Sequence, residues 1–238
     1  MRAVEAADLL STRLDALDPW GPELTRHLGE PMGDGLRRLE VLKLAALLHD
    51  VAKPETRTVD HGRIRFIGHD VIGAARARVI AERWRLSRRA ADVLGVLVAQ
   101  HLRPMHLASA PEVTRRARYR FFRDLATETR DLLLLSLVDA AAVRGDSPLA
   151  VWTGAGGAVV RDLMSGMAEA ASAAAASPLL RGEDVMTAFD LPPGPAVGRL
   201  LARAREAQAL GLVRSRAEAL DHLRRVAALD TSEDGPIE

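Results

Sequence analysis

The chain has 238 residues, of which 48% are hydrophobic and 27% charged, and its formal net charge is +1. This balance is typical of a globular protein, and the near-neutral charge gives no general argument for nucleic-acid binding, although it allows a local basic face. There is no cysteine, so disulfides and thiolate ligands are excluded and any metal site must use histidine and carboxylate side chains.

The first part of the chain is expected to form short helices separated by loops. Aromatic residues make up only 3% of the sequence, which favours a core of closely packed helices built from Ala, Leu and Val. Gly29–Gly35 contains one Pro and several Gly residues and is predicted to be a loop. The helix after this loop should be stopped by Pro54 and carries the pair His49-Asp50 at its end. The predicted helices are Val4–Leu17, Glu23–Leu28 and Leu36–Val51.

A change of pattern follows Pro54. The turn-like sequence Asp60-His61-Gly62-Arg63 lies between two short β-branched runs, at 56–59 and 64–67. This pattern is compatible with a small β-hairpin and with an irregular loop, and the sequence leaves both open.

Helical spacing resumes after Gly68. Ser87 is a suitable N-cap, and Pro104 should end the helix that Ser87 begins. The last long helix of this part is apolar almost all round, which predicts that it is the most buried. Asp139 lies inside it, and a carboxylate buried there must be paired or coordinated, since burying it alone costs several kcal/mol. The predicted helices are Asp70–Trp84, Arg88–Leu102, Val113–Thr127, Arg130–Arg144 and a further one that ends near Ala176.

A segment of different composition begins at Ser177-Pro178. It predicts a short helix, a Pro-Pro-Gly-Pro turn and two further helices. We therefore expect three parts: a helical domain over residues 1–176, a small helical tail domain over 177–230, and a polar, acidic and disordered end over 231–238.

The succession of LAALLHDVAKP, TRTVDHGRIRFIGHD, LVAQHLRP and LLLLSLVDAAAVRGD resembles the HD superfamily of metal-dependent phosphohydrolases. More closely, the chain from about Leu42 to its end resembles the HD-containing C-terminal half of bacterial tRNA nucleotidyltransferases, the CCA-adding and poly(A)-polymerase-like family. The resemblance implies an all-α fold, an HD-type helical bundle with a possible small β-hairpin and a C-terminal helical appendage. The tail residues that match the family are Gly182, Asp184, Met186, Gly194, Pro195, Gly198, Leu200, Leu201, Glu206, Ala207, Gln208 and Gly211.

The pair His49-Asp50 is the centre of the candidate metal site. Adjacent residues on a helix point about 100° apart, so both side chains can reach one cation beside the last turn. The resemblance implies that the pair holds a divalent metal together with a distant Asp, a role that Asp139 takes by its position in LVDAAAVRG. His69 and His101, at a helix start and a helix end, are further candidate ligands. Alternatively, His49 caps its helix and Asp139 pairs with an arginine of a neighbouring helix.

One expected ligand is missing from the pattern. HD phosphohydrolases normally supply another histidine on the first helix, and the predicted helix Val4–Leu17 contains none. His27 is a possible substitute. Without that ligand the site has one histidine and two aspartates, a set that suits Mg²⁺ or Mn²⁺ better than Zn²⁺ or Fe²⁺.

Basic residues near the pair are candidates for substrate binding. Lys53, one helical turn past His49, could contact a substrate phosphate, and Arg63 in the possible hairpin could do the same. Asp50 and Lys53 are the candidate catalytic residues.

The run Thr114–Arg123 is basic, with interleaved aromatic residues. Such a face can hold an RNA backbone while the rings stack on bases, although Phe121 and Phe122 could equally be core residues beside solvated arginines. The arginines of the RNA interpretation are Arg115, Arg116, Arg118 and Arg120.

Two functions therefore stay open. The first is a metal-dependent phosphohydrolase, a phosphomonoesterase or phosphodiesterase, acting on a nucleotide or other phosphate ester. The second is a helical module that binds tRNA or other structured RNA and has a vestigial metal site. No Gly-Ser pair with paired carboxylates precedes Leu42, so nucleotide addition would need a separate nucleotidyltransferase subunit or a longer parent chain. No apolar run could cross a bilayer and no signal peptide follows Met1, so we expect a cytoplasmic protein without a membrane partner.

Overall fold

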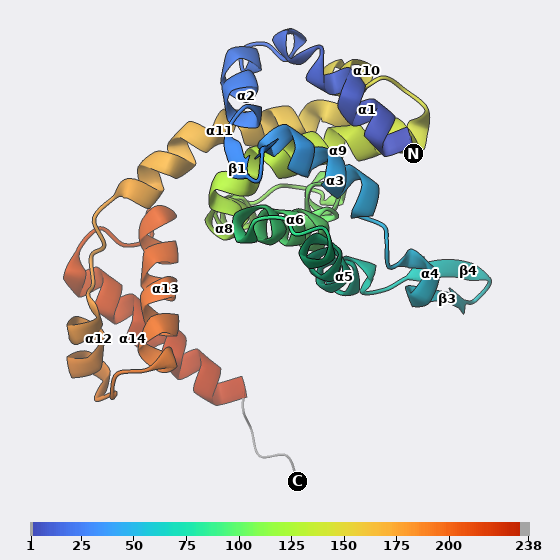
Figure 1. Cartoon of the computed structure of the whole chain (residues 1–238). Helices are drawn as coiled ribbons and strands as arrows, with labels where there is room; N and C mark the ends of the chain where they lie inside the picture. The colour runs from blue at the N-terminus through green and yellow to red at the C-terminus, as the bar shows by residue number, and fades with distance from the viewer. Residues whose placement is uncertain (1, 234–238) are drawn as a thin grey trace. The chain divides into compact units, whose positions relative to one another are not determined.

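The computed structural model of the chain describes residues 2–233. These residues are mostly helical, with two small two-stranded sheets, which confirms the predicted all-α fold (Figure 1). They form two compact units. The large unit contains residues 2–113 and 125–166, and the small unit contains residues 114–124 and 167–233. None of the described helices is long and apolar enough to cross a membrane.

The large unit begins with α1 (Arg2–Ser11), a 3-10 turn over Leu14–Ala16, and α2 (Gly21–Leu28). α1 is shorter than the predicted helix Val4–Leu17. The hydroxyl groups of Ser11 and Thr12 donate to the carbonyls of Asp8 and Leu9, and such bonds compete with helix continuation. The chain therefore leaves the helix before the apolar pattern ends.

A small hairpin lies where a loop was predicted. It consists of β1 (Pro31–Gly33) and β2 (Leu36–Arg37), which pair antiparallel. Asp34 and Gly35 form the turn with positive φ angles of 53° and 76°. The hairpin leads into α3 (Arg38–Leu48), so His49 and Asp50 follow the last turn of this helix.

Pro54 belongs to a second, short helix. α3 ends at Leu48, and Pro54 lies in the first turn of α4 (Lys53–Thr56), where an absent N–H group is tolerated. β3 (Arg57–Asp60) and β4 (Arg63–Phe66) follow and pair antiparallel, with Val59 opposite Ile64. The structure thus shows a hairpin rather than an irregular loop.

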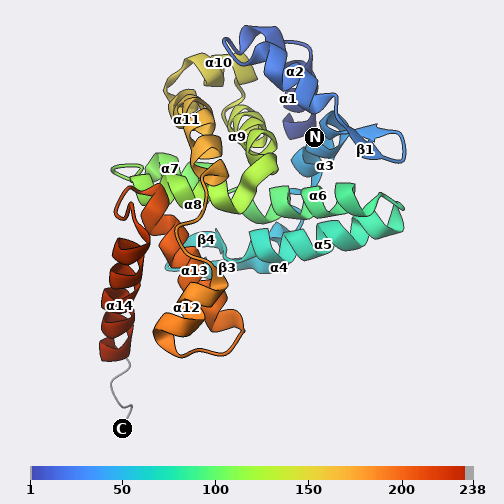
Figure 2. The ribbon, with the colours of Figure 1, turned by 90° about the vertical axis from the view of Figure 1, so that its left-hand side faces the viewer.

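α5 (His69–Arg83) and α6 (Arg88–Gln100) lie side by side (Figure 2). Their close approach depends on small residues, since a Cβ atom at Gly73 would lie 3.3 Å from Val98. Ser87 caps α6 as predicted, accepting a hydrogen bond from the Ala90 N–H. Pro104 is not followed by a loop, because it lies in the first turn of a further helix, α7 (Arg103–Ser109).

The core of the large unit is built on α9 (Thr129–Arg144). Its residues Leu132–Leu135, Leu137 and Val138 are each 1% exposed or less, as expected for a helix that is apolar all round. A 3-10 turn over Ala126–Glu128 precedes α9, and α10 (Pro148–Thr153) and a turn over Ala155–Gly157 follow it.

The small unit combines α8 (Arg115–Leu125), except for its last residue, with three helices of the tail. These are α12 (Gly182–Phe189), α13 (Pro195–Ala209) and α14 (Arg216–Glu233), the short helix and two further helices that were predicted. Their shared core is formed by Leu180, Val185, Val197, Ala204, Ala207, Val213, Ala219 and Leu223.

The boundary between the two units falls inside a helix. α11 (Ala158–Ala175) is continuous and passes from the large unit to the small one between Gly166 and Met167. We predicted a boundary after residue 176, where the composition changes. At the other end, α14 includes residues 231–233, within the segment expected to be disordered, and residues 234–238 lie outside the described part of the chain.

Candidate metal centre

Ends of helices bring the candidate ligands together in the large unit. His49 follows the last residue of α3, His69 is the first residue of α5, and His101 follows the last residue of α6. Asp50 lies in the turn after α3, and Asp139 lies in the second half of α9. The three imidazoles are buried, whereas the side chains of Asp50 and Asp139 are 36% and 37% exposed. The cluster is therefore closed on the histidine side and accessible on the carboxylate side.

The carboxylate of Asp50 lies between the histidines. Its Oδ2 atom is 3.3 Å from Nε2 of His49, and its Oδ1 atom is 3.4 Å from Nε2 of His69 and 3.8 Å from Nε2 of His101. Asp139, 89 positions later in the chain, places Oδ1 3.3 Å from Nε2 of His49. Ligand atoms of Asp50, His69 and His101 all lie within 4.8 Å of one another, close enough to share one ion. The five sequence-predicted ligands are thus linked pairwise at 3.8 Å or less, with Asp139 joined to the others through His49.

The backbone determines which ring nitrogen of each histidine faces the cluster. In each case Nδ1 lies within hydrogen-bonding distance of the carbonyl oxygen three residues earlier. The distances are 3.1 Å from His49 to Ala46, 2.6 Å from His69 to Phe66 and 2.7 Å from His101 to Val98. A carbonyl can only accept, so Nδ1 carries the proton and Nε2 of the neutral ring presents a lone pair. This is the arrangement found in metal-binding histidines.

The contact between His69 and His101 tests whether a cation fits. Their Nε2 atoms are 3.2 Å apart. When both Nδ1 atoms donate to carbonyls and both rings are neutral, these two lone pairs face each other without a proton between them. A cation at this position would satisfy both, together with the carboxylate of Asp50. The donor set therefore fits a divalent metal.

The two carboxylates favour positive charge at this point. Burial lowers the pKa of His49, but its hydrogen bonds to Asp139 and Asp50 outweigh burial and raise the pKa to about 9. Burial raises the pKa of Asp50, and the contacts with His49 and Lys53 lower it by more, to well below its usual range. Burial lowers the pKa of His101, which keeps its ring neutral and available as a ligand.

The exposure of Asp139 differs from what the sequence predicts. It was expected to be buried in an apolar helix, but its side chain is 37% exposed because it faces the accessible side of the cluster. The buried carboxylate of α9 is Asp131, whose side chain is 1% exposed. Asp131 was missed because it lies in the first turn of the helix, where a carboxylate is ordinary.

His27 does not join the cluster. Its Nε2 atom is 2.9 Å from Oδ2 of Asp131, and the same oxygen accepts a 2.7 Å hydrogen bond from Arg38. Arg38 also donates to Glu30 at 2.9 Å. His27 is therefore part of a buried ion-pair network, and the substitution for a first-helix ligand that the sequence suggested is wrong.

Lys53 lies at the rim of the cluster. Its Nζ atom is 2.7 Å from Oδ2 of Asp50 and 5.5 Å from the centre of the Phe66 ring, and its side chain is 39% exposed. Arg63 is exposed at the start of β4, opposite Asp60, and no interaction described here joins it to the cluster. Lys53 can reach a ligand of the cluster, whereas Arg63 stays a prediction.

The arginines of α8 are partly occupied by one carboxylate of the small unit. Glu206 accepts from Arg120 through both of its oxygens at 3.0 Å, and Arg116 lies 2.9 Å from the same group. Phe121 is fully buried, as a core residue would be. Arg115 is exposed and Arg118 is partly exposed.

Comparisons with known proteins agree with this geometry. The HD domain family matches residues 23–142, which include all five residues of the cluster. An A-adding tRNA nucleotidyltransferase of Deinococcus radiodurans is 38% identical over 189 residues, covering 79% of this chain and 42% of the relative. A CC-adding tRNA nucleotidyltransferase of Thermus thermophilus is 37% identical over 74% of this chain and 38% of the relative.

A second group of relatives matches a shorter stretch. A bifunctional uridylyltransferase/uridylyl-removing enzyme of Aromatoleum aromaticum is 35% identical over 123 residues, covering 52% of this chain and 13% of the relative. The chain thus spans about two fifths of the length of the tRNA nucleotidyltransferases it matches, and much less of the uridylyltransferase.

Proposed function

This chain belongs to the HD domain family, and on that basis we propose that it is a metal-dependent phosphohydrolase acting on a nucleotide or another phosphate ester. One observation supports the proposal most directly. Three imidazoles hold their Nδ1 protons on backbone carbonyls and turn their Nε2 atoms toward two carboxylates. A structural role would not need the Nε2 atoms of His69 and His101 to face each other at 3.2 Å while their Nδ1 atoms are held by carbonyls.

The metal would be held by His49, Asp50, His69, His101 and Asp139. When bound, a divalent cation supplies a Lewis acid for a phosphoryl oxygen and lowers the pKa of a water molecule. The sequence favoured Mg²⁺ or Mn²⁺ for a set with one histidine, but the cluster contains three imidazoles. This set is less suited to Mg²⁺, which prefers oxygen ligands, and it makes Fe²⁺ and Zn²⁺ candidates beside Mn²⁺.

Side chains at the rim of the cluster would bind the substrate. The ammonium group of Lys53 is held by Asp50 and by the Phe66 ring, so it is positioned at the accessible side of the cluster. We propose that Lys53 pairs with a substrate phosphate there and, with Asp50, forms the catalytic group. Arg63 would be a weaker phosphate contact on the hairpin.

Metal analysis combined with a hydrolysis assay tests this function. We expect the purified protein to bind Mn²⁺ and to hydrolyse bis(p-nitrophenyl) phosphate or p-nitrophenyl phosphate in a chelator-sensitive manner. Asp50→Asn should weaken metal binding by about 100-fold or more and abolish hydrolysis, because it removes a central ligand. The matched control is Asp92→Asn, a carboxylate on α6 that is 65% exposed.

Two results would contradict the proposal. Hydrolysis by Asp50→Asn in the presence of chelator would exclude a metal-dependent reaction. Equal metal binding by the wild-type protein and Asp50→Asn, with both folded by circular dichroism, would exclude the cluster as the metal site.

A second candidate function is tRNA binding. It is favoured by the extent of the similarity, because the match to tRNA nucleotidyltransferases covers 79% of this chain while the HD domain ends at residue 142. The small unit also carries the basic helix α8. In this alternative the chain is an RNA-binding module, which a nucleotidyltransferase subunit or a longer parent chain would complete.

Gel-shift titration of tRNA at two salt concentrations tests the alternative. Affinity should fall steeply with salt, because each neutralised phosphate releases counterions. Replacing Arg115, Arg116 and Arg118 together by Gln should flatten this slope and weaken binding to structured RNAs of different sequence alike. Absence of a shift at low salt would end the RNA hypothesis.

A further inference from the structure

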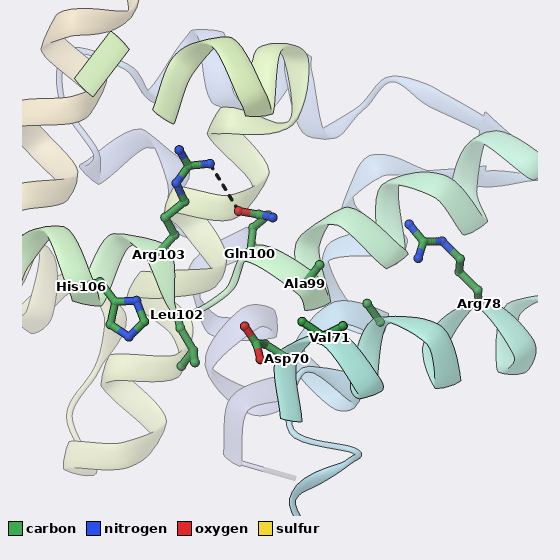
Figure 3. A pocket seen from close by; sticks show the side chains of 9 residues that line it. Asp70, Val71, Arg78, Ala99, Gln100, Leu102, Arg103 and His106 are labelled. Carbon is green, nitrogen blue, oxygen red and sulfur yellow. Dashed lines mark hydrogen bonds between the residues drawn. The ribbon is translucent and has the colours of Figure 1, made fainter. Parts of the chain in front are cut away.

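A cavity of about 370 Å³ lies in the large unit, but its cationic side chains do not converge (Figure 3). Arg78 and Arg103 lie at opposite ends of it, with Val71 and Ala99 between them. This cavity therefore gives no argument for a point at which two guanidinium groups hold one anion.

A smaller cavity, of about 220 Å³, lies in the small unit. Its walls come from three helices, α8, α13 and α14. Sites for drug-sized ligands measure roughly 300–1,000 Å³, so this cavity suits one small chemical group rather than a whole nucleotide. The charged or titratable residues of its lining are Arg116, Arg120, Arg203, Glu206 and His222. With three arginines and one carboxylate, the lining carries an excess of positive charge.

The contacts of Glu206 show that guanidinium groups converge at this cavity. Its two carboxylate oxygens each accept a 3.0 Å hydrogen bond from Arg120, and its Oε1 atom lies 2.9 Å from Nε of Arg116. Arg123 places Nη1 3.7 Å from Oε2 of the same carboxylate. An arginine binds a carboxylate through the same pair of parallel hydrogen bonds that it offers to a phosphate. Glu206 therefore marks a point where arginines of α8 hold an anionic group.

One carboxylate does not neutralise these cations. Each guanidinium has five N–H donors, whereas a single carboxylate offers about four acceptor positions. The side chain of Glu206 is 11% exposed, while those of Arg116 and Arg120 are 57% and 51% exposed. The carboxylate is thus covered and the guanidinium groups reach the surface, so a second anion can approach them from solvent.

His222 of α14 lies in the same positive field. Burial lowers the pKa of its imidazole, and the positive charges of Arg225 and Arg116 lower it further. A neutral imidazole can still donate one N–H hydrogen bond to a bound anion. Of the seven histidines in the sequence, His222 alone falls within the described residues of the small unit, so its NMR signals report on this cavity.

We propose that this cavity binds a phosphate group. Arg116 and Arg120 donate hydrogen bonds to its oxygens and His222 donates from α14, while Glu206 keeps the guanidinium groups in place and limits the affinity by its charge. The phosphate is either that of a free phosphate compound or that of an RNA backbone, since the recognising chemistry is the same. The RNA source rests on the tRNA-binding alternative, whereas the free source goes beyond both candidate functions.

Titration with inorganic phosphate in EDTA at constant ionic strength, followed by NMR of the His222 ring, tests the proposal. The chelator removes metal, and loss of the signals in His222→Gln assigns them. Bound phosphate should shift these signals and raise the pKa of His222, because an anion favours the protonated ring and offsets the arginine charges. Arg116→Gln should weaken phosphate binding by about tenfold or more, because it removes a charged hydrogen-bond donor.

Glu206→Gln should change phosphate binding in the opposite direction. It removes the negative charge that repels phosphate but keeps a side-chain oxygen that can accept from Arg120. Phosphate should therefore bind about three to ten times more tightly to this variant. A carboxylate that served only as a structural ion-pair partner would give no such gain.

Two controls match these changes. Arg37→Gln removes an arginine of the large unit that is 58% exposed and, like Arg116, pairs with a glutamate. Glu183→Gln neutralises an exposed carboxylate in the first turn of α12. Both variants should bind phosphate as the wild-type protein does.

Each outcome decides the proposal. Unchanged His222 signals in phosphate, or equal affinity of Arg116→Gln and Arg37→Gln, would overturn it. Weaker binding by Glu206→Gln, with the fold intact by circular dichroism, would overturn it too.

An oligouridylate without terminal phosphates separates the two sources. If it shifts the His222 signals, and does so less in Arg116→Gln, the cavity accepts a backbone phosphate. If inorganic phosphate alone gives the expected pattern, the cavity accepts a free phosphate compound, and the tRNA-binding alternative gains no support from it. None of these results depends on hydrolysis, so a failure of the phosphohydrolase proposal would be seen separately.

Discussion

Asp131 is the buried charge on which the packing of α2, α3 and α9 depends. One of its oxygens accepts hydrogen bonds from both His27 and Arg38, at 2.9 and 2.7 Å. Arg38 is 3% exposed and also pairs with Glu30, which lowers the pKa of that carboxyl group through its hydrogen bond. A buried cation needs such partners because its desolvation is not otherwise compensated.

We expect Asp131→Ala to destabilise the protein by about 3–5 kcal/mol, since Arg38 would be left buried without its main partner. Urea unfolding followed by circular dichroism measures this loss. Asp92→Asn, at an exposed site, should change the free energy of unfolding by less than about 0.5 kcal/mol. Similar stability of the two variants would show that the Asp131 network does not support the fold.

The two aspartates of α9 show what the sequence could and could not predict about single residues. The apolar pattern correctly indicated that a carboxylate in this helix needs a partner. It could not tell Asp131 from Asp139, because an all-round apolar helix does not reveal which side faces solvent. His49 and Asp50 were found because they share a helix end, whereas the convergence with His69 and His101 depends on how α5 and α6 pack.

At the scale of elements, helix ends position the candidate ligands. Arg38 begins α3 and His49 follows its end, about 16 Å away at 1.5 Å per residue. Asp131 precedes Asp139 on α9, as Arg38 precedes His49 along α3. The two helices are therefore joined by the buried pair of Arg38 and Asp131 near one end and by the candidate centre near the other. Fixing one end restricts how far the carboxylate and imidazole at the other end can separate.

Most helices were predicted from their periodicity, the short α2 and α12 included, whereas β1, β2 and α7 were missed. Strands β1 and β2 have three and two residues, too few for a visible alternation. α7 was missed because Pro104 was taken only as the end of one helix. Proline also fits the first turn of the next helix, where its fixed φ angle is favourable.

Ser87 offers a test of how an element is held in place. Its hydroxyl accepts from the Ala90 N–H at 3.1 Å and also donates to the carbonyl of Met32 in β1. Ser87→Ala should lower the free energy of unfolding by about 1–2 kcal/mol. This is more than the loss of a helix cap alone, because the change also leaves the Met32 carbonyl without this donor. Thermal or urea unfolding provides the measurement.

Ser147→Ala is the matched control. Ser147 caps α10 through the Ala150 N–H at 3.1 Å. The Ser147→Ala variant should lose only the contribution of a helix cap to the free energy of unfolding, about 1 kcal/mol. If both variants lose the same free energy, the bond from Ser87 to β1 contributes nothing measurable.

At the scale of the whole molecule, the two candidate functions are located in different units. All five candidate metal ligands belong to the large unit, and Glu206 with its arginine partners belongs to the small unit. A ligand stabilises the part of a protein that binds it, because it favours the folded form of that part. The two functions should therefore leave different patterns of protection.

Hydrogen exchange followed by mass spectrometry can separate these patterns. Adding Mn²⁺ should slow amide exchange at the ends of α3 and α6, the start of α5 and the second half of α9, because these carry the candidate ligands, and it should leave α12, α13 and α14 unchanged. Asp50→Asn should remove this effect. Adding tRNA in EDTA should instead slow exchange in α8 and in the tail helices if the RNA interpretation holds. Protection by Mn²⁺ in the small unit alone would contradict the metal centre, because the cluster that defines it would then be unaffected by the metal.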